Sequence, residues 1–406
     1  MVETRVVRYF KLNFALVYFS FIAYIYDQII PLYFQKAGLN PFQISLIFGA
    51  GTIAFTIWSV YTGTLYDLYG RKKLIFSGLI LGILGQIFFI VSINPITLTI
   101  AKILDIMAWV SVFYALLYHF EDKISYKNRG YKTGILLAIS DSMKVVAPFA
   151  GGFLADKFTI TTPFFVSLVL YTLMLIVVYF KKTEEDKEIV KEKKTSFAKR
   201  TELFFKSLKF FWNIPKLRWV AIGGIFLLAA LNVFLIFSPL YLKDLGFSLT
   251  QIGFTYTLYI LGSMTYPFFG ALTDKGGRLL LMFSSLIFSS LFILAFSYAI
   301  SPITIYVVSA LIGAVTSGWA IAMFAMLSDF GEFTGKEGSI LGSYFAITRI
   351  GSLVGQLIGG AIAFYDIRLS FIVFSVILFF FSFVFYFKTY KLPKFREVYV
   401  GKARLK

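Results

Sequence analysis

Two short stretches decide the fold of this chain: residues 63–73 read GTLYDLYGRKK, and residues 270–278 read GALTDKGGR. Both contain the pattern G-x-L-x-D, and in both a Gly-Arg pair follows shortly afterwards. Equivalent positions in the two stretches differ by 207 residues (270 − 63). A motif that returns at a fixed offset indicates that the chain contains two copies of one structural unit.

Further matches extend this repeat over the whole chain, at an offset of 208 residues (239 − 31). The matching pairs are Pro31-Leu32-Tyr33 with Pro239-Leu240-Tyr241, Gly38 with Gly246, Gln43-Ile44 with Gln251-Ile252, Gly130 with Gly338, Gly134 with Gly342, and Gly151-Gly152 with Gly359-Gly360. Shared composition does not produce such an ordered series, so we infer a duplication. Parallel halves of this kind place a substrate site between them, near the bilayer midplane.

The composition is that of a membrane protein. Hydrophobic residues make up 58% of the 406 positions and charged residues only 15%, whereas a soluble domain carries about 25% charged residues. Apolar runs close to the ~20 residues that a membrane-spanning helix needs recur along the chain. We therefore predict an all-α integral membrane protein, with twelve transmembrane helices in two six-helix halves related by pseudo-two-fold symmetry. The expected spans are residues 12–35, 41–67, 74–93, 96–120, 131–155, 161–180, 219–242, 249–273, 279–299, 303–328, 339–364 and 369–387.

The chain divides into four expected regions. They are an N-terminal six-helix half (1–180), a cytoplasmic linker (181–218), a C-terminal six-helix half (219–390) and a basic cytoplasmic tail (391–406). The linker begins with the mixed charge run KKTEEDKEIVKEKK and continues over 195–214 with alternating apolar and basic residues. This second part predicts an amphipathic helix, which lies either on the inner membrane surface or packed beneath the bundle.

The distribution of basic residues predicts the orientation. Expected inner segments carry most of them, including Arg71, Lys72 and Lys73, whereas the expected outer loops carry only Lys36, Lys157, Lys243 and Arg368. Because basic residues concentrate in cytoplasmic loops, we predict a multi-pass protein of the plasma membrane with both termini in the cytoplasm. The same rule accounts for the net charge of +18 without a nucleic-acid partner.

The two stretches described first resemble the G-x-L-x-D-(R/K)-x-G-R-(R/K) motif of the major facilitator superfamily. Leu68 stands where the first copy should have a basic residue, and the second copy has Lys275 there. The resemblance covers the whole chain and implies the fold of that superfamily and a transport function.

The motif also has a physical interpretation. Glycines permit a tight turn between antiparallel helices, and a carboxylate at a helix end can accept from the arginine or lie near the N-terminus of another helix. Such a cluster would be a conformational latch between the halves on the inner side, or only a static turn. Its candidate residues are Gly63, Asp67, Gly70, Arg71, Glu121, Gly270, Asp274, Gly277, Arg278 and Asp329.

The fifth expected span contains Pro148-Phe149-Ala150-Gly151-Gly152. This is similar to the G-P-x-x-G-G ending of a motif found in the drug–proton antiporters of the superfamily, although Met143 and Ala147 replace two of its glycines. A kinked, closely packed helix would use the same small residues. The sequence GGFLADK at 151–157 repeats the short G-x-L-x-D string on the expected outer side, without the Gly-Arg pair.

Six ionisable residues lie well inside the expected spans, where charges are costly and usually face a wet or protein-lined interior. We expect these six to bind substrate or protons: Asp27, Lys102, Asp105, Asp141, Lys144 and Arg349. Lys102 falls where the superfamily has an arginine linked to proton coupling. Asp27 is the first candidate for proton exchange, because a low-dielectric cavity favours the protonated form of a carboxylate. Asp141 and Lys144 would equally form a structural ion pair.

These observations favour a secondary active transporter of a small solute that works by alternating access. We expect proton coupling and export of hydrophobic or cationic compounds. The alternatives are import of an anionic or sugar-like solute, or a membrane-embedded enzyme or transporter-like sensor. With no cysteine and the single histidine His119, the chain offers no obvious metal site. We therefore expect no cofactor, no enzyme activity, and a monomer whose partners are the substrate, protons and the lipid bilayer.

Overall fold

The computed structural model describes residues 14–121, 129–180, 197–334 and 337–390, and every regular element within them is a helix. After a first helix over residues 14–24, the elements are η1 (Asp27–Ile29), α2 (Ile30–Lys36), α3 (Pro41–Val91), α4 (Pro95–Glu121), α5 (Arg129–Lys157), α6 (Thr162–Phe180), α7 (Phe197–Asn213), α8 (Pro215–Asp244), α9 (Leu249–Ser263), α10 (Tyr266–Gly276), α11 (Arg278–Tyr298), α12 (Pro302–Thr334), α13 (Glu337–Tyr365) and α14 (Ile367–Tyr390).

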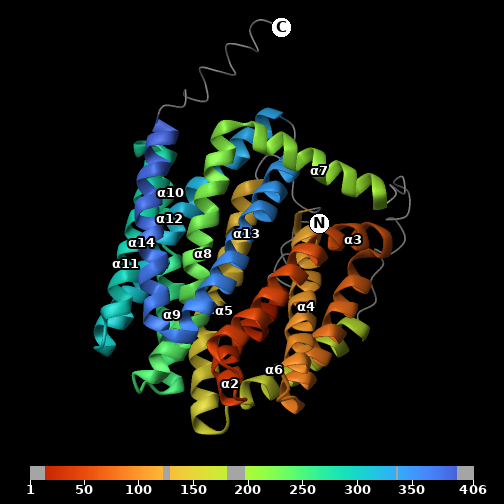
Figure 1. The fold of residues 1–406 in the computed structure, drawn as a ribbon. Helices are drawn as coiled ribbons and strands as arrows, with labels where there is room; N and C mark the ends of the chain where they lie inside the picture. The colour runs from red at the N-terminus through yellow and green to blue at the C-terminus, as the bar shows by residue number, and fades with distance from the viewer. Residues whose placement is uncertain (1–13, 122–128, 181–196, 335–336, 391–406) are drawn as a thin grey trace, which may run out of the picture.

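Among the described residues, ten segments are long and apolar enough to cross a membrane. Helix α5 and the α9–α10 pair supply the two remaining predicted spans. By their order in the chain, the elements up to α6 belong to one half and α8 to α14 to the other, and in Figure 1 α5 lies between the two groups, packed mainly against α9. The predicted fold is thereby confirmed, and the last two spans, α13 and α14, separate at Asp366.

Glycines make the turns in the two copies of the motif. The second and third predicted spans run together as α3, and the chain turns within it at Gly70, whose φ of 77° and ψ of 167° are not helical. Gly277, with a φ of 88°, separates α10 from α11 in the same way. A positive φ costs glycine little because it has no Cβ, so both predicted turns are confirmed.

Two of the predicted spans are broken helices. The first span bends at residues 25–26 and continues through the 3₁₀ helix η1 into α2, where Pro31 is the second residue. The eighth span stops at Ser263 and restarts at Tyr266, immediately before Pro267. Proline lacks an N–H, and the first turn of a helix can do without one because its N–H groups have no partner within the helix, so both prolines suit the start of the second helical piece.

Helix α8 contains Pro239 but stays continuous. Proline cannot donate to the carbonyl four residues earlier, which here belongs to Leu235. The hydroxyl of Tyr256, from α9, donates to that carbonyl instead. A side chain from a neighbouring helix thus supplies the hydrogen bond that the proline removes.

Glycines on α13 allow it to approach α8 closely. A Cβ at Gly351 would lie 2.1 Å from the carbonyl oxygen of Ile225, and a Cβ at Gly355 would lie 2.3 Å from that of Ala229. Only glycine fits at such distances, as expected for the small-residue interfaces of membrane helices.

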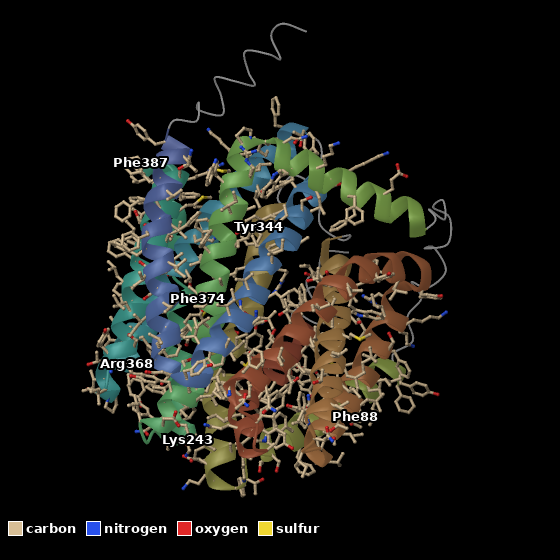
Figure 2. All side chains as sticks on the ribbon, in the orientation of Figure 1. Phe88, Lys243, Tyr344, Arg368, Phe374 and Phe387 are labelled. Carbon is tan, nitrogen blue, oxygen red and sulfur yellow. The ribbon has the colours of Figure 1, made fainter. Side chains whose placement is uncertain are left out.

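The predicted amphipathic helix is α7, at one end of the bundle. It packs against α8 and α13: Phe211 is fully buried, and the Ser207 hydroxyl donates to that of Ser339 over 3.3 Å. Its other face leaves Phe205 62% exposed. Lys243 and Arg368, both from expected outer loops, lie at the end of the bundle opposite α7 (Figure 2). We call that end the outer end.

Candidate functional site

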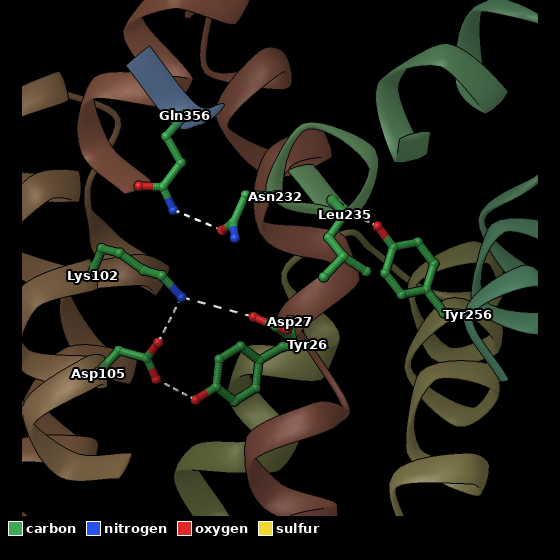
Figure 3. A network of polar contacts seen from close by, with 8 residues as sticks. All are labelled: Tyr26, Asp27, Lys102, Asp105, Asn232, Leu235, Tyr256 and Gln356. Atoms are coloured by element: carbon green, nitrogen blue, oxygen red, sulfur yellow. Dashed lines mark hydrogen bonds and ion pairs between the residues drawn. The ribbon is translucent and has the colours of Figure 1, made fainter. Parts of the chain in front are cut away.

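Asp27 lies at the break in the first span, as the first residue of η1. Its side chain is 53% exposed, although its neighbours Tyr26 and Gln28 are buried. Figure 3 shows it between Lys102 of α4 and the α8 residues Asn232 and Leu235. Because η1 contacts α5 in its own half and α8 and α9 in the other, the break places this carboxylate where the two halves meet.

Lys102 is shared by two carboxylates. Its Nζ lies 3.0 Å from Oδ2 of Asp105 and 3.8 Å from Oδ1 of Asp27. The hydroxyl of Tyr26 donates to the other oxygen of Asp105 over 2.5 Å (Figure 3). Asp105 is therefore buried and held by two donors, whereas Asp27 is open and only loosely paired. The two carboxylates therefore differ in setting: Asp105 is the closer partner of Lys102, and Asp27 is the more exposed one.

The predicted pairing of Lys102 with Asp105 is thus observed, and Asp27 joins them from another helix. These three residues, together with Tyr26, form what we call the charged cluster. The ring of Phe48 lies 5.1 Å from the Lys102 Nζ and closes the cluster on the α3 side. Buried charges persist when they are paired and hydrogen-bonded, and this geometry meets that condition.

A second polar network joins the halves. The hydroxyl of Thr52 on α3 donates to Oε1 of Gln356 over 2.8 Å, and Nε2 of Gln356 donates to Oδ1 of Asn232 over 3.0 Å. Asn232 in turn donates to the hydroxyl of Ser352 over 3.1 Å. These uncharged groups are not among the residues predicted to bind substrate or protons, all of which are charged. Amides within apolar spans were the available signal, since such residues commonly bond between membrane helices.

The remaining predicted charges lie apart from the cluster. Arg349 of α13 crosses to the other half and stacks on Phe55, with its Cζ 3.8 Å from the ring centroid. Lys144 of α5 lies over the ring of Tyr24, 5.0 Å from the centroid. The side chain of Asp141 lies outside the described residues, so its predicted pairing with Lys144 stays a prediction.

The structure describes part of the predicted latch. Arg278 of α11 pairs with Asp329 of α12 and donates to the carbonyl of Ala325 over 2.9 Å. Both partners belong to the C-terminal half, so this pair does not by itself join the halves. Gly70 and Gly277 make the turns, Arg71 lies at the first of them, and Gly270 has no neighbour that a Cβ would meet within 4 Å. The surroundings of Gly63 and the side-chain positions of Asp67, Glu121 and Asp274 are outside the described residues.

The Pro148–Gly152 segment faces two different elements. A Cβ at Gly151 would lie 1.6 Å from the carbonyl oxygen of Ile25, at the break of the first span, and one at Gly152 would lie 2.3 Å from that of Leu249 on α9. The amide of Gln28 also donates to the carbonyl of Pro148 over 2.8 Å. These small residues therefore let α5 touch both η1 and the opposite half.

A family model described as Major Facilitator Superfamily matches this chain over residues 12–334 and 241–402. The chain belongs to the major facilitator superfamily. Among its relatives, an MFS-type transporter of Methanocaldococcus jannaschii is 26% identical, and the match covers 82% of this chain and 86% of that protein. Multidrug resistance protein MdtG of Escherichia coli is 23% identical, with 85% of both chains covered.

Solved structures agree on the fold. The crystal structure of the nucleoside transporter NupG superposes with a TM-score of 0.77 at 13% identity, covering 94% of this chain and all of that one. At that identity the likeness concerns the fold alone.

Proposed function

We propose that this protein is a proton-coupled secondary transporter that exports hydrophobic or cationic compounds by alternating access, with both termini in the cytoplasm. One observation supports the coupling above all others. Asp27 is an exposed carboxylate, it lies on a broken helix that contacts both halves, and it shares Lys102 with a better-held carboxylate. Such a group can gain and lose a proton without dismantling its surroundings.

The geometry suggests how the proton acts. When Asp27 is ionised, Lys102 is attracted by two carboxylates, and when Asp27 is protonated, the pair of Lys102 with Asp105 remains. The charge of η1 therefore changes while α4 keeps its internal pair. Because η1 touches α8 and α9 of the other half, that change alters the balance between conformations that separate or join the halves.

The relatives and an aromatic cluster support the proposed class of cargo. Two proteins matching most of this chain are named multidrug resistance proteins, from Bacillus subtilis and Escherichia coli. On α4, Trp109 stacks on Phe113 with centroids 4.7 Å apart, and Phe55 of α3 lies 6.1 Å from Trp109. Phe55 is buried, but Trp109 and Phe113 are partly exposed, and such rings suit flat apolar or cationic molecules.

The test is transport by purified protein in liposomes, with ethidium as the hydrophobic cation. We expect a pH gradient to drive ethidium against its concentration gradient in the wild type. The variant Asp27→Asn should lose gradient-driven transport but keep ethidium exchange in the absence of a gradient, because only the proton step is removed. Asp366→Asn, on an outer loop, is the matched control. Gradient-driven transport that is unchanged in Asp27→Asn would refute the proposed role of Asp27.

Arg349 favours a second candidate, an anionic cargo. Its guanidinium stacks on Phe55, and within the described part of the chain no carboxylate lies within ion-pair distance of it. A stacked arginine retains the donors that recognise a carboxylate or phosphate. If an anion is carried, Arg349→Gln should reduce transport of an anionic dye such as fluorescein at least tenfold and leave ethidium transport unaffected. Equal effects on both probes would exclude an anion-specific role.

A further inference from the structure

The outer ends of α5 and α9, which belong to different halves, are joined by the carboxylate of Asp156. This residue is exposed and lies on the last turn of α5, beyond the expected end of its span. Its oxygens accept from the hydroxyl of Thr250 over 2.8 Å, the amide of Leu249 over 3.3 Å and the amide of Thr250 over 3.4 Å. Figure 1 shows the two helices side by side at this end.

These contacts complete the N-terminus of α9. The first N–H groups of a helix have no partner within the helix. Ser248 and Gln251 form a capping box that satisfies the amides of Gln251 and Ser248. The amides of Leu249 and Thr250 are left over, and Asp156 accepts from both. Its negative charge also lies at the positive end of the α9 dipole. Part of the cap of α9 therefore comes from the opposite half.

Two glycines bring the helices close enough for this contact. A Cβ at Gly152 would lie 2.3 Å from the carbonyl oxygen of Leu249, and a Cβ at Gly253 would lie 2.3 Å from that of Pro148. Asp156 lies one helical turn beyond Gly152 and Leu249 one turn before Gly253, so the cap continues the same contact face. The short string G-x-L-x-D at 152–156 thus has a structural role at the outer end.

The equivalent interface between α13 and α3 lacks this cap. At the repeat offset of 208 residues, Phe364 replaces Asp156 and Pro41 replaces Leu249. The acid is therefore missing on one helix, and on the other the proline offers no N–H. Gly360 still approaches Ser45 closely, since a Cβ there would meet its hydroxyl at 2.0 Å. Both interfaces are tight, but at their outer ends only the α5–α9 interface has a carboxylate cap among the described residues.

We propose that Asp156 is an outer clasp, which caps α9 across the two halves and holds the transporter closed on its outer side. The described contacts between the halves lie in the outer parts of three helices, which agrees with an outer-closed state. On α3 they lie between its outer start and Phe55, on α13 they lie between Arg349 and its outer end, and on α5 they lie between Val145 and its outer end. Opening the outer side separates α5 from α9 and leaves two amides of α9 without their partner. This inference rests on the proposed alternating-access cycle. Within that cycle, the clasp sets the ratio of the outer-open to the outer-closed state.

The clasp responds to pH in a defined direction. Partial burial raises the pKa of Asp156, but hydrogen bonds from Thr250, Ser248 and the amide of Leu249 outweigh it and place the pKa below its ordinary value. A lowered pKa means that the clasp is fully formed above the ordinary pKa of an aspartate and is lost as the pH falls through the lowered one. Stronger acid outside therefore favours outer opening.

Few other charges act on this carboxylate. Helices α6 and α9 and the loop at 158–161 contain no charged residue. Lys157 follows Asp156 and lies over the ring of Phe153, 6.0 Å from its centroid. Asp244, at the end of α8, is another carboxylate at this end of the bundle. A variant of Asp244 therefore separates the two responses.

The chain has no natural cysteine, so single probes can be introduced directly. Ile93 and Ile300 are each 74% exposed on outer loops of different halves, and spin labels at both positions report the outer separation. Thr257 lies inside the α5–α9 interface, where its hydroxyl donates to the carbonyl of Val145 over 2.6 Å. A cysteine at position 257 reacts with a membrane-impermeant maleimide only when the helices part, which detects even a rare open state.

Removing the clasp should open the outer side. Loss of an N-cap corresponds to about 0.5–2 kcal/mol, or roughly a 2- to 30-fold change in a population ratio. We expect Asp156→Ala to raise the open-to-closed ratio and the labelling rate by a factor in that range. Asp156→Asn keeps an acceptor and should have a smaller effect. Both variants should fold, because Ser248 and Gln251 still cap α9.

The matched control is Asp366→Ala. Asp366 caps α14 within its own half, accepting from the amide of Arg368 over 2.7 Å, so its loss should leave the outer ratio unchanged. The acid-induced opening should disappear in Asp156→Ala and persist in Asp244→Asn. Neither measurement requires a substrate or a proton gradient, so the clasp can be judged even if the proposed transport function is wrong. A labelling rate in Asp156→Ala equal to those of the wild type and Asp366→Ala overturns the proposal.

Discussion

Lys102 should be the most sensitive single position of the charged cluster. Its side chain and that of Asp105 are 5% and 8% exposed, and their charged atoms are 3.0 Å apart. Replacing Lys102 with methionine keeps the length of the side chain but leaves the buried carboxylate without its cation. Removing one partner of a buried ion pair costs about 3–5 kcal/mol. We expect Lys102→Met to lower the free energy of unfolding by that amount.

A double-mutant cycle isolates the pair. Asp105→Asn retains an acceptor for the hydroxyl of Tyr26 and leaves Lys102 facing Asp27 at 3.8 Å, so it should cost less than Lys102→Met. In the double variant, which carries both Lys102→Met and Asp105→Asn, no unpaired charge remains at position 105. Most of the free energy of unfolding that is lost in Lys102→Met should therefore be recovered.

The assay is equilibrium unfolding in mixed micelles of mild detergent and SDS, followed by tryptophan fluorescence. Lys157→Met is the control, because this lysine is exposed and lies over the ring of Phe153, so its loss should change stability by no more than about 0.5 kcal/mol. The reasoning fails if Lys102→Met is as stable as this control, or if the double variant loses the sum of the two single losses.

Two further predictions concern the packing of the C-terminal half. Gly355→Ala places a methyl group 2.3 Å from the Ala229 carbonyl oxygen and should cost about 1–3 kcal/mol by the same unfolding assay. Gly342→Ala, where no atom lies within 4 Å, should be neutral or slightly stabilising, and equal losses in both would contradict the tight α8–α13 contact. Tyr256→Phe removes the donor to the Leu235 carbonyl and should cost about 1–3 kcal/mol. Combining it with Pro239→Ala, which restores a backbone N–H to α8, should recover part of that loss, and an additive loss would show that the hydroxyl does not serve this carbonyl.

The architecture could be predicted from the sequence because it depends on local and repeated properties. Apolar runs of membrane-spanning length, a repeat offset near 208 residues and paired motifs are all visible without a structure. In a bilayer every backbone polar group must be satisfied within the protein, which makes helices the only choice for such runs. The turns at Gly70 and Gly277 follow from the glycines themselves.

The sequence also found the ionisable residues of the candidate site but not all of their partners. Lys102 and Asp105 are three residues apart on one helix, so their pairing was predictable. Asp27 lies 75 positions earlier in the chain (102 − 27), and no local pattern relates it to Lys102. Its approach requires the break at residues 25–29, which depends on the fit of Gly151 against the Ile25 carbonyl.

The sequence by itself thus determined the membrane class, the duplicated helical architecture and the list of residues able to carry charge inside the membrane. Only the tertiary structure decided which polar groups of different helices meet. It paired Asp27 with Lys102, linked Thr52 to Gln356, and set Asp156 on the N-terminus of α9. The physical reason is that hydropathy and helix periodicity act over neighbouring residues, whereas an ion pair or a cap needs an approach of a few ångströms between helices. That approach is fixed by small residues and breaks distributed over both halves.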